Sequence, residues 1–305
     1  MKRLLNTLYI TSGNRYLSLD GENVVVMEDK KEIGRIPLHN LQAIVTFGYT
    51  GASPALMGAC AQRNIELSFM SGNGRFLARV SGEEKGNVTL RKTQYRISEK
   101  KEESVKIAKN FILGKVYNAR WVLERAARDY SMRLDAELLK KKSAFLGQSM
   151  NKIRECEDAG TLLGLEGEAA SVYFSAFDER ILQQKEDFYF HGRNKRPPLD
   201  NVNAMLSFGY SLLAGMCGGA LEAVGLDPYV GFFHTDRPGR MSLALDLMEE
   251  FRSVMVDRFV LTLINKRIMK PEYFLTKENG AVIMTEEGRK AFLSAWQGKK
   301  QEMIT

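Results

Sequence analysis

The chain has 305 residues, 44% hydrophobic and 27% charged, which is an ordinary globular composition and enough length for two domains. Lysine and arginine outnumber aspartate and glutamate by 44 to 37, so the net charge is +7, which favours a polyanionic partner such as nucleic acid. Three widely spaced cysteines without a CxxC pair argue against a zinc site or a disulfide framework. With no signal peptide at the first residues, we expect a cytoplasmic protein.

Short strand signals at close spacing fill the first part of the chain. Strands are predicted over residues 8–10, 16–19, 24–27, 33–37, 43–45, 65–69 and 76–80, with a short helix over 53–63. Asp20-Gly21 and Asn73-Gly74 are typical hairpin turns. We therefore predict a small β domain over residues 1–85.

Beyond this region the hydrophobic period changes from two to 3.6, which is typical of helices. Long helices are predicted over 98–130, 132–154, 157–184, 200–225 and 242–268, with a short hairpin at Asn279-Gly280 and a last short helix after it. The expected fold class is thus α+β. A linker over residues 86–97 joins the β domain to a larger all-α domain over residues 98–305.

Residues 204–221 carry no charge and are just long enough to cross a membrane. The stretch holds four glycines and two serines, and Glu222 follows it directly. We therefore predict a central buried helix in place of a membrane span.

Residues 231–258 read GFFHTDRPGRMSLALDLMEEFRSVMVDR and predict a polar loop followed by a helix that Ser242 caps. Asp246 and Glu249 lie one turn apart on the stripe opposite the apolar face, and His234 lies just ahead of them. Two carboxylates and an imidazole suit a divalent cation. The alternative is a solvated acidic face with a loop histidine. We expect loss of one acid to leave folding almost unchanged, because removing a solvent-facing acid leaves no buried cavity.

Glu166 lies between Gly164 and Gly167 in a predicted helix, although each glycine costs about 1 kcal/mol there relative to alanine. The missing side chains would let a large group approach the Glu166 carboxylate. Close packing of two helices through small residues is the alternative explanation.

A loop over residues 191–200 carries three cations, Arg193, Lys195 and Arg196, together with Gly192 and two prolines. This composition suits contacts to phosphates without base recognition, although an ordinary basic loop between two helices has the same composition. Asp200 is expected to cap the following helix.

Together these stretches resemble the Cas1 (Cas-one) family, the CRISPR-associated integrases of spacer acquisition. The resemblance spans nearly the whole chain. It depends on three motifs in this order: Leu165-Glu166-Gly167 with Ala169-Ala170 and Tyr173; Arg196-Pro197-Pro198 with Asn203 and Gly209-Tyr210; and His234 with Ser242 to Glu249 and Phe251-Arg252. Two positions depart from the family pattern, because Glu249 stands where aspartate is common and Glu250 where proline is common.

The resemblance implies a DNA integrase and endonuclease that holds Mg²⁺ or Mn²⁺ through Glu166, His234 and Glu249, with Asp246 as a neighbouring acid that orients the site. It also implies that Arg252 contacts DNA, and we add Arg237 and Arg240 beside the basic loop as candidate DNA contacts. The implied reaction is attack by the 3′-hydroxyl of a captured DNA fragment on a CRISPR repeat end.

The implied partners are double-stranded DNA, a second copy of the chain bound through the β domain, and the small adaptation protein Cas2 (Cas-two). The alternative function is a catalytically silent DNA-binding scaffold. A hydrolase of small phosphate esters has little support, because the chain has no GxxxxGK[ST] loop.

Overall fold

The computed structural model describes residues 6–72, 74–83 and 87–304, of which residues 301–304 are described by backbone alone. The chain forms two compact units. The first comprises Met1–Glu84, Ile268–Lys277 and Ile283–Thr305, and the second comprises Lys85–Arg267 and Glu278–Val282. We refer to them as the strand-rich unit and the helical unit. The α+β fold class is confirmed.

The strand-rich unit contains every strand that the first 85 residues predict. The elements are β1 (Thr7–Ile10), β2 (Arg15–Asp20), β3 (Asn23–Glu28), β4 (Lys31–Pro37), β5 (Ala43–Phe47), β6 (Gly51–Ala52), α1 (Pro54–Gln62), β7 (Glu66–Met70) and β8 (Phe76–Val80). Only the two-residue strand β6 was not predicted, because it is too short to show a period. Gly21 adopts φ +56°, as the predicted turn requires, whereas Asn73 lies outside the described residues.

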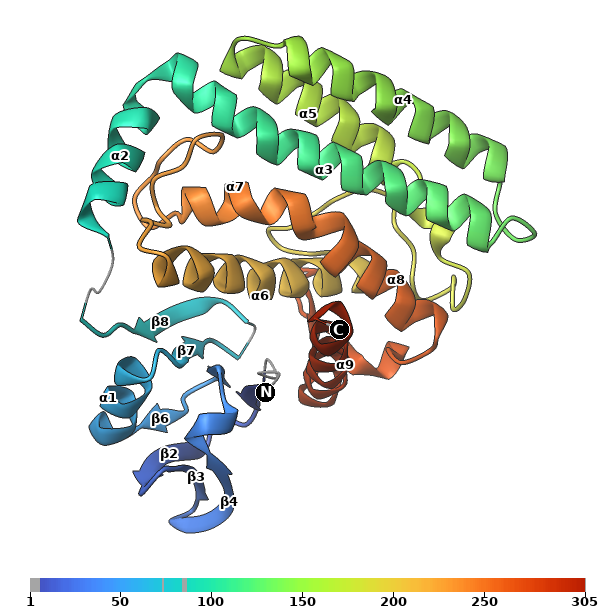
Figure 1. The fold of residues 1–305 in the computed structure, drawn as a ribbon. Helices are drawn as coiled ribbons and strands as arrows, with labels where there is room; N and C mark the ends of the chain where they lie inside the picture. Colours follow the sequence, from blue (N-terminus) through green and yellow to red (C-terminus); the bar gives the residue numbers. More distant parts are fainter. Residues whose placement is uncertain (1–5, 73, 84–86, 305) are drawn as a thin grey trace. The chain divides into compact units, whose positions relative to one another are not determined.

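Two four-stranded sheets form this unit (Figure 1). In one, the order is β1-β5-β7-β8, with β1, β5 and β7 parallel and β8 antiparallel to β7. In the other, the order is β4-β3-β2-β6, with β2, β3 and β4 as an antiparallel meander. Leu17, Ile44, Leu56 and Leu67 are fully buried in the core that these sheets and α1 share.

The C-terminal residues belong to the strand-rich unit, which differs from the predicted helical domain over residues 98–305. Helix α9 (Glu286–Ile304) follows the predicted hairpin of β9 (Phe274–Thr276) and β10 (Val282–Met284). Lys300 Nζ donates to Thr7 Oγ1 at 2.7 Å, and Ser12 Oγ donates to Glu286 Oε1 at 2.6 Å. Contacts between residues this far apart in sequence leave no periodic signal, so the sequence could not show that the C-terminal residues belong to the strand-rich unit.

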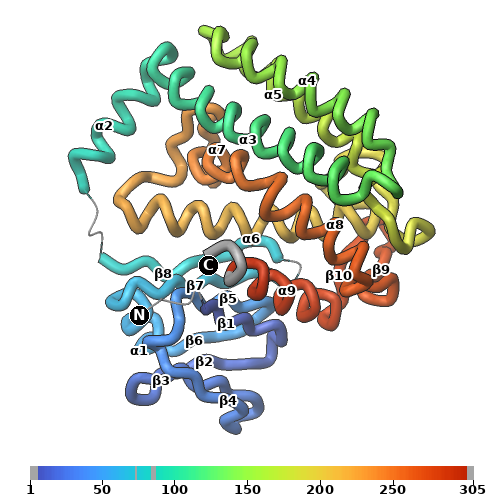
Figure 2. Tube along the Cα trace, turned by 45° about the vertical axis from the view of Figure 1, so that its right-hand side comes forward, coloured from blue at the N-terminus to red at the C-terminus, as the bar shows by residue number. Residues whose placement is uncertain are grey.

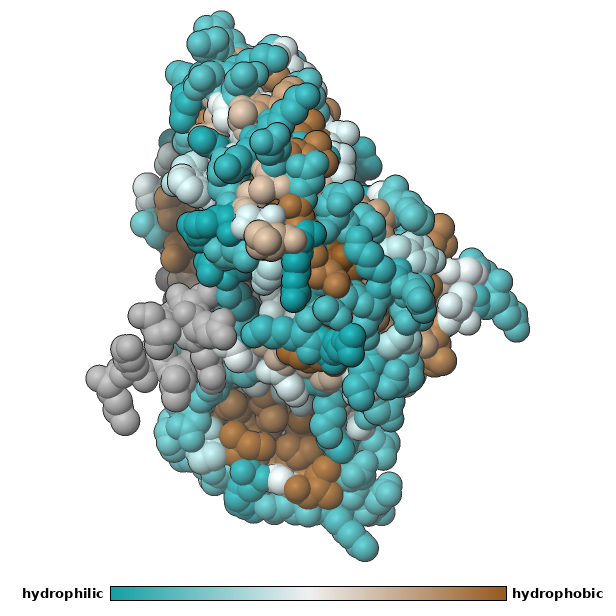
Figure 3. Space-filling model, turned by 90° about the vertical axis from the view of Figure 1, so that its right-hand side faces the viewer, coloured by the Kyte–Doolittle hydropathy of each residue, from teal (hydrophilic) through white to brown (hydrophobic). Residues whose placement is uncertain are grey.

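The strand-rich unit also exposes large apolar side chains. Figure 3 shows a hydrophobic patch on its surface. Among the exposed residues of this unit are Ile33 on β4 and Phe76 and Leu77 on β8, and both strands lie at a sheet edge.

The helical unit is built mainly from α-helices, with the short 3₁₀-helix η2 (Asp178–Arg180) between α5 and α6. The other helices are α2 (Val88–Glu99), α3 (Lys101–Asp129), α4 (Ala136–Glu155), α5 (Ala159–Phe174), α6 (Asn201–Ala223), α7 (Ser242–Phe251), the π-helical turn η3 (Arg252–Asp257) and α8 (Arg258–Asn265). Helix α3 lies between α4 on one side and α7 on the other, and α6 packs beneath α7 (Figures 1 and 2). Ile112, Leu123, Leu146 and Leu162 are fully buried where α3, α4 and α5 meet.

Helix α2 occupies residues that were predicted to be a linker. Asn87 caps it by accepting a hydrogen bond from the Leu90 backbone N–H at 3.1 Å. Gln94, 3% exposed, donates to the carbonyls of Asp227 and Val230 and so attaches α2 to a later loop. This segment is therefore a packed helix of the helical unit.

Helix α6 is the one described helix whose length and composition would allow it to cross a membrane. Its side chains, however, lie mostly inside the helical unit, among them Val202, Leu206 and Leu213, each 2% exposed or less. Asp200 caps it as predicted, accepting from the Asn203 N–H at 2.7 Å. The predicted central helix is confirmed.

The predicted helix over residues 157–184 is shorter than expected, since α5 ends at Phe174. Beyond it the Asn265 side chain accepts from the Leu182 N–H at 2.8 Å and donates to the Arg180 carbonyl at 2.9 Å. A long-range side chain thus supplies bonds that a continued helix would have made. The predicted helix over residues 242–268 is likewise interrupted by η3.

Candidate functional site

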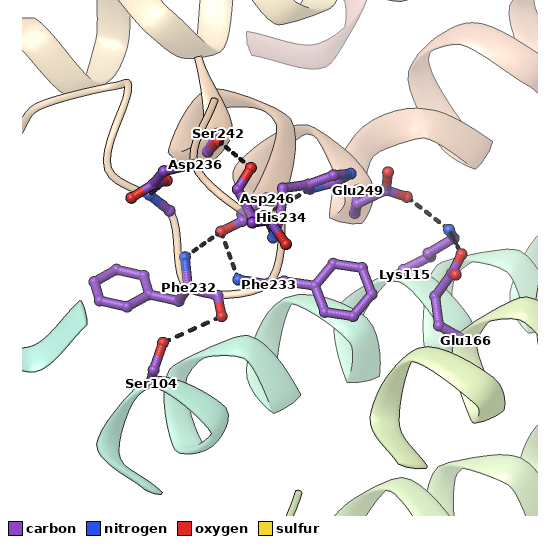
Figure 4. Close-up of polar contacts among 12 residues, drawn as sticks. Ser104, Lys115, Glu166, Phe232, Phe233, His234, Asp236, Ser242, Asp246 and Glu249 are labelled. Carbon is purple, nitrogen blue, oxygen red and sulfur yellow. Dashed lines mark hydrogen bonds and ion pairs between the residues drawn. The ribbon is translucent and has the colours of Figure 1, made fainter. Parts of the chain in front are cut away.

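The loop that carries His234 is held to α7 by one buried carboxylate, that of Asp246. Asp246 Oδ2 accepts from the backbone N–H groups of Phe232 at 2.7 Å and Phe233 at 3.0 Å, and Oδ1 accepts from that of His234 at 2.9 Å. Asp246 is fully buried, so these bonds replace all of its contacts with water. The path of the loop is therefore set by the position of this side chain (Figure 4).

Gly231 is required at the start of this loop. A Cβ there would stand 2.7 Å from Ser242 Cβ and 3.0 Å from Asp246 Oδ2, distances that no side chain can adopt without displacing its neighbours. Ser242 itself is the first residue of α7, fully buried, and does not cap the helix as predicted. The carbonyl of Pro228 accepts from the N–H groups of Leu243 and Ala244 instead.

The His234 ring is oriented by the same carboxylate. Its Nδ1 lies 2.7 Å from Asp246 Oδ1, and the side chain is 20% exposed. A carboxylate beside Nδ1 fixes the tautomer with the proton on that nitrogen, which leaves Nε2 as an acceptor or a ligand. The His234–Asp246 pair thus has the arrangement of a histidine oriented for binding through Nε2.

Glu166 and Glu249 approach one another from α5 and α7 and share a cation, Lys115 of α3. Lys115 Nζ donates to Glu166 Oε1 and lies 2.7 Å from Glu249 Oε2 (Figure 4). The side chains of Lys115, Glu166 and Glu249 are only 13%, 16% and 4% exposed. The structure therefore brings together two acids that are 83 positions apart in the sequence, with a positive charge between them.

A second cation holds the other side of Glu249. Arg252 donates from one nitrogen to Oε1 at 2.8 Å and to Oε2 at 3.1 Å. Burial alone would raise the pKa of Glu249, but the charges of Arg252 and Lys115 outweigh it and lower the pKa to about 2. Glu249 is thus a fixed anion at neutral pH.

Arg252 is positioned in turn by Tyr210 of α6 and Asp257 of η3. Its guanidinium lies 4.4 Å from the Tyr210 ring centroid, and the Tyr210 hydroxyl donates to Asp257 Oδ1. Burial raises the pKa of Asp257, and the Tyr210 hydrogen bond and the Arg252 charge oppose that change. The π-helical turn places both Arg252 and Asp257 against Tyr210.

The predicted solvated acidic face is wrong. Every polar residue on that stripe is buried, namely Ser242, Asp246, Glu249, Ser253 and Asp257. A stripe of alternating polar residues on a helix has the same sequence pattern whether it faces water or an internal polar cluster. The expectation that loss of one of these acids would leave folding almost unchanged assumed a solvent-facing acid, and the burial of Asp246 and Glu249 removes that premise.

The six predicted DNA contacts fall into two groups. Arg193 donates within its own unit to Asn203 Oδ1 at 2.7 Å and to Ser207 Oγ at 3.0 Å, and Arg252 is committed to Glu249. The exposed group comprises Lys195, Arg196 and Arg237, with Arg240 partly exposed. Partial burial and then the charges of Arg252, Arg193, Arg196 and Arg240 lower the pKa of Lys195, which indicates that these cations are neighbours.

Lys115, Tyr210 and Asp257 were not predicted as members of the site, although Tyr210 belongs to one of the motifs on which the resemblance depends. Lys115 stands in α3 beside the buried residues Ile112 and Val116. A lysine at the edge of an apolar stripe is the one signal that the sequence offered. Its two partners, Glu166 and Glu249, lie on helices distant in sequence, so the sequence could not show that Lys115 would meet them.

No group of three histidine, cysteine, aspartate or glutamate side chains is close enough to hold a metal ion within the residues that the structure describes. Of the three predicted ligands, Glu166 and Glu249 meet at Lys115, while His234 pairs with the predicted orienting acid Asp246. Asp246 and Glu249 lie one helical turn apart on α7, so these two groups are neighbours on that helix.

Comparisons with known proteins agree over almost the whole chain. Residues 8–298 match the profile of a family described as CRISPR associated protein Cas1. Two proteins named CRISPR-associated endonuclease Cas1 are similar: one from Chlorobaculum tepidum is 46% identical over all of this chain and 89% of its own length, and one from Rhodospirillum rubrum is 50% identical over 99% and 88%.

Solved structures share the fold. A Cas1 protein from Thermotoga maritima superposes with a TM-score of 0.83 at 23% identity, covering 98% of this chain and 93% of its own. A casposase bound to its integration product gives 0.81 at 26% identity, covering 97% and 82%. A Cas6-RT-Cas1–Cas2 complex gives 0.80 at 23% identity, covering 99% of this chain and 32% of its own.

We expect Asp246→Ala to lower the free energy of unfolding by on the order of 3 kcal/mol, because it removes a fully buried carboxylate and leaves the partly buried N–H groups of Phe232, Phe233 and His234 without this acceptor. Urea unfolding measures this. Asp236→Ala is the matched control, since exposed Asp236 accepts only the Gly231 N–H and should cost less than about 1 kcal/mol. Equal effects of the two variants would contradict the anchoring role of Asp246.

Glu249 should give the protein a stability component that depends on pH. Its folded pKa, about 2, lies below the ordinary 4.5, so the contribution is fully present above 4.5 and is lost as pH falls through about 2. The shift corresponds to on the order of 3 kcal/mol. The difference in unfolding free energy between the wild type and Glu249→Gln in EDTA should therefore shrink from pH 6 to pH 3. Exposed Glu168→Gln should show no such trend, and a constant difference for Glu249→Gln would count against the assigned pKa.

Proposed function

The chain belongs to the Cas1 family of CRISPR-associated proteins, and we propose that it is a DNA integrase and endonuclease that inserts captured DNA fragments into a CRISPR array. The relatives at 46% and 50% identity carry the name endonuclease, and a structural neighbour is a casposase bound to an integration product. The observation that carries the proposal is the convergence of Glu166 and Glu249 on one cation beside an oriented histidine.

We propose Glu166, Glu249 and His234 Nε2 as the groups that hold Mg²⁺ or Mn²⁺. The donor set fits: two carboxylates already direct oxygens at a common cation, and the Nδ1 bond leaves Nε2 available. When bound, such an ion polarises a phosphodiester and neutralises charge on its oxygens. Asp246 then acts through His234 by fixing its tautomer, and Arg252 acts through Glu249 by holding it ionised.

The chemical step that we propose is transesterification, with the 3′-hydroxyl of a DNA fragment as the nucleophile. The hydroxyl oxygen bonds to a phosphorus of the repeat strand as the bond to that strand's leaving 3′-oxygen breaks, and one proton moves from the attacking to the leaving oxygen. Water in place of the 3′-hydroxyl would give hydrolysis, the endonuclease activity.

Glu166→Gln, Glu249→Gln and His234→Ala should each lower strand transfer at least ~100-fold, because each removes one proposed ligand. The assay follows joining of a labelled fragment to a repeat-containing duplex with Mn²⁺. Fragments that end in a 3′-dideoxynucleotide should abolish joining while leaving cleavage, which separates integration from hydrolysis. Thermal melting of each variant reports folding.

The matched control is Glu168→Gln, an exposed acid two residues from Glu166 on the same helix, which should retain full activity. Full activity in folded Glu166→Gln or His234→Ala would rule out the assigned site and favour the scaffold function.

The exposed cations beside the site are proposed to bind DNA phosphates. Replacing Lys195 and Arg196 together by glutamine should weaken duplex binding at low salt and reduce the slope of log Kd against log salt by about 2. Lys140→Gln with Lys141→Gln removes the same charge from the exposed face of α4 and serves as the control. A salt slope unchanged by the first pair would exclude these two side chains as phosphate contacts.

We further propose a homodimer through the strand-rich unit and, as for other members of the family, a complex with Cas2. Support for the dimer is the edge strand β8, which exposes Phe76 and Leu77 by 39% and 47%. An unpaired apolar edge favours pairing with another chain.

Light scattering at micromolar concentration should therefore give twice the 34.5 kDa chain mass, and Phe76→Asp with Leu77→Asp should give the single mass. Met132→Asp, at a 96% exposed position of the helical unit, should leave the dimer intact. A wild type that is monomeric at this concentration would remove the proposal.

A further inference from the structure

The two acids proposed as metal ligands are already neutralised by the protein. Glu166 and Glu249 carry two negative charges, and Lys115 and Arg252 carry two positive charges within salt-bridge distance of them. A divalent cation added between the acids would leave two excess positive charges in a poorly solvated place, which is unfavourable. One of the two internal cations must therefore withdraw when a metal binds.

Lys115 is the cation that can withdraw. Its ammonium is the group between the two acids, whereas Arg252 bonds Glu249 alone and is held against the Tyr210 ring. A lysine side chain rotates about four bonds, while the planar guanidinium of Arg252 is fixed by its stacking.

A second position for the ammonium lies close by. A cavity of about 20 Å³ borders Lys115, and its lining includes Ala119, Ala169 and Ala170 together with the cation Arg252 and the acid Asp257, whose charge can face the displaced ammonium. A volume of this size holds about one water molecule, and an ammonium group is of similar size. Ser253 Oγ also lines the cavity and is buried without a hydrogen-bond partner among the described residues, so it could accept from the displaced group.

We propose that Lys115 is an internal counter-ion that occupies the metal position between Glu166 and Glu249 in the metal-free protein and is displaced when the divalent cation binds. This inference rests on the proposed function, since it needs these two acids to be ligands. It makes Lys115 a positioning residue that stabilises the empty site and weakens metal affinity.

The test measures Mn²⁺ affinity by calorimetry, and melting temperature in EDTA and in Mn²⁺, for the full chain. Lys115→Met should bind Mn²⁺ about ten-fold more tightly or better, because no ammonium has to be displaced. Its melting temperature in EDTA should fall by roughly 5 °C or more and be restored by Mn²⁺. Simple damage to the fold would weaken binding, so a gain in affinity cannot come from it.

Two further variants keep the result interpretable. Lys115→Gln removes the charge but keeps a hydrogen-bond donor for both acids, and it should also tighten binding if Lys115→Met does not fold. Lys109→Met is the matched control: Lys109 lies on the same helix, but its Nζ donates to the carbonyls of Arg154 and Cys156. It should lose stability in EDTA without any gain in Mn²⁺ affinity.

The outcomes separate the two proposals. Tighter Mn²⁺ binding by Lys115→Met or Lys115→Gln supports the inference. If the wild type binds Mn²⁺ and both variants bind it with equal or lower affinity, the counter-ion role of Lys115 is overturned. The proposed metal site is not affected by that result. Absence of Mn²⁺ binding in the wild type and in both Lys115 variants overturns the metal site and the counter-ion role together.

Discussion

The bonds that converge on Asp246 hold the candidate site together. A carboxylate that is withdrawn from water must be compensated, and here three successive backbone N–H groups and one imidazole provide the compensation. Because these N–H groups belong to the loop and the carboxylate belongs to α7, neither element can take its position without the other. The path of the loop and the orientation of the histidine ring are both set by this one side chain.

The other charged side chains of the site balance one another, since two acids, Glu166 and Glu249, face two cations, Lys115 and Arg252. Charged groups at this depth are costly unless each has an opposite charge near it, which explains why a lysine from α3 and an arginine from η3 meet acids from α5 and α7. The two cations therefore compensate the two acids within the helical unit itself.

Most of the fold could be predicted from the sequence, because periodicity is a local property. The strands of the first unit and the buried helix α6 follow from alternating or continuous apolar runs and from caps such as Asp200. Assignments that depended on contacts between distant segments could not be predicted. The tail that joins the strand-rich unit through Lys300 and the packed helix in place of the linker are of this kind.

The sequence indicated which residues belong to the candidate site, but not how their side chains contact one another. The acids and the histidine were singled out by residue type and spacing, which left a solvated face open as the alternative, and the resemblance to a family then implied their role as ligands. The burial of Asp246, the bridge through Lys115 and the commitment of Arg252 to Glu249 depend on how four helices meet. Periodicity reports which residues share a face of a helix, but not what that face meets.

The π-helical turn η3 determines which way α8 faces relative to α7. It places one more residue in a turn than an α-helix would, so if the same residues formed a regular α-helix, α8 would be rotated by about 100° relative to α7. The buried face of α8, with Phe259, Val260 and Leu263, would then point away from its neighbours, and Asp257 would leave Tyr210. A substitution in this stretch changes one side chain at a time, whereas loss of the π-helical turn would reorient the whole of α8.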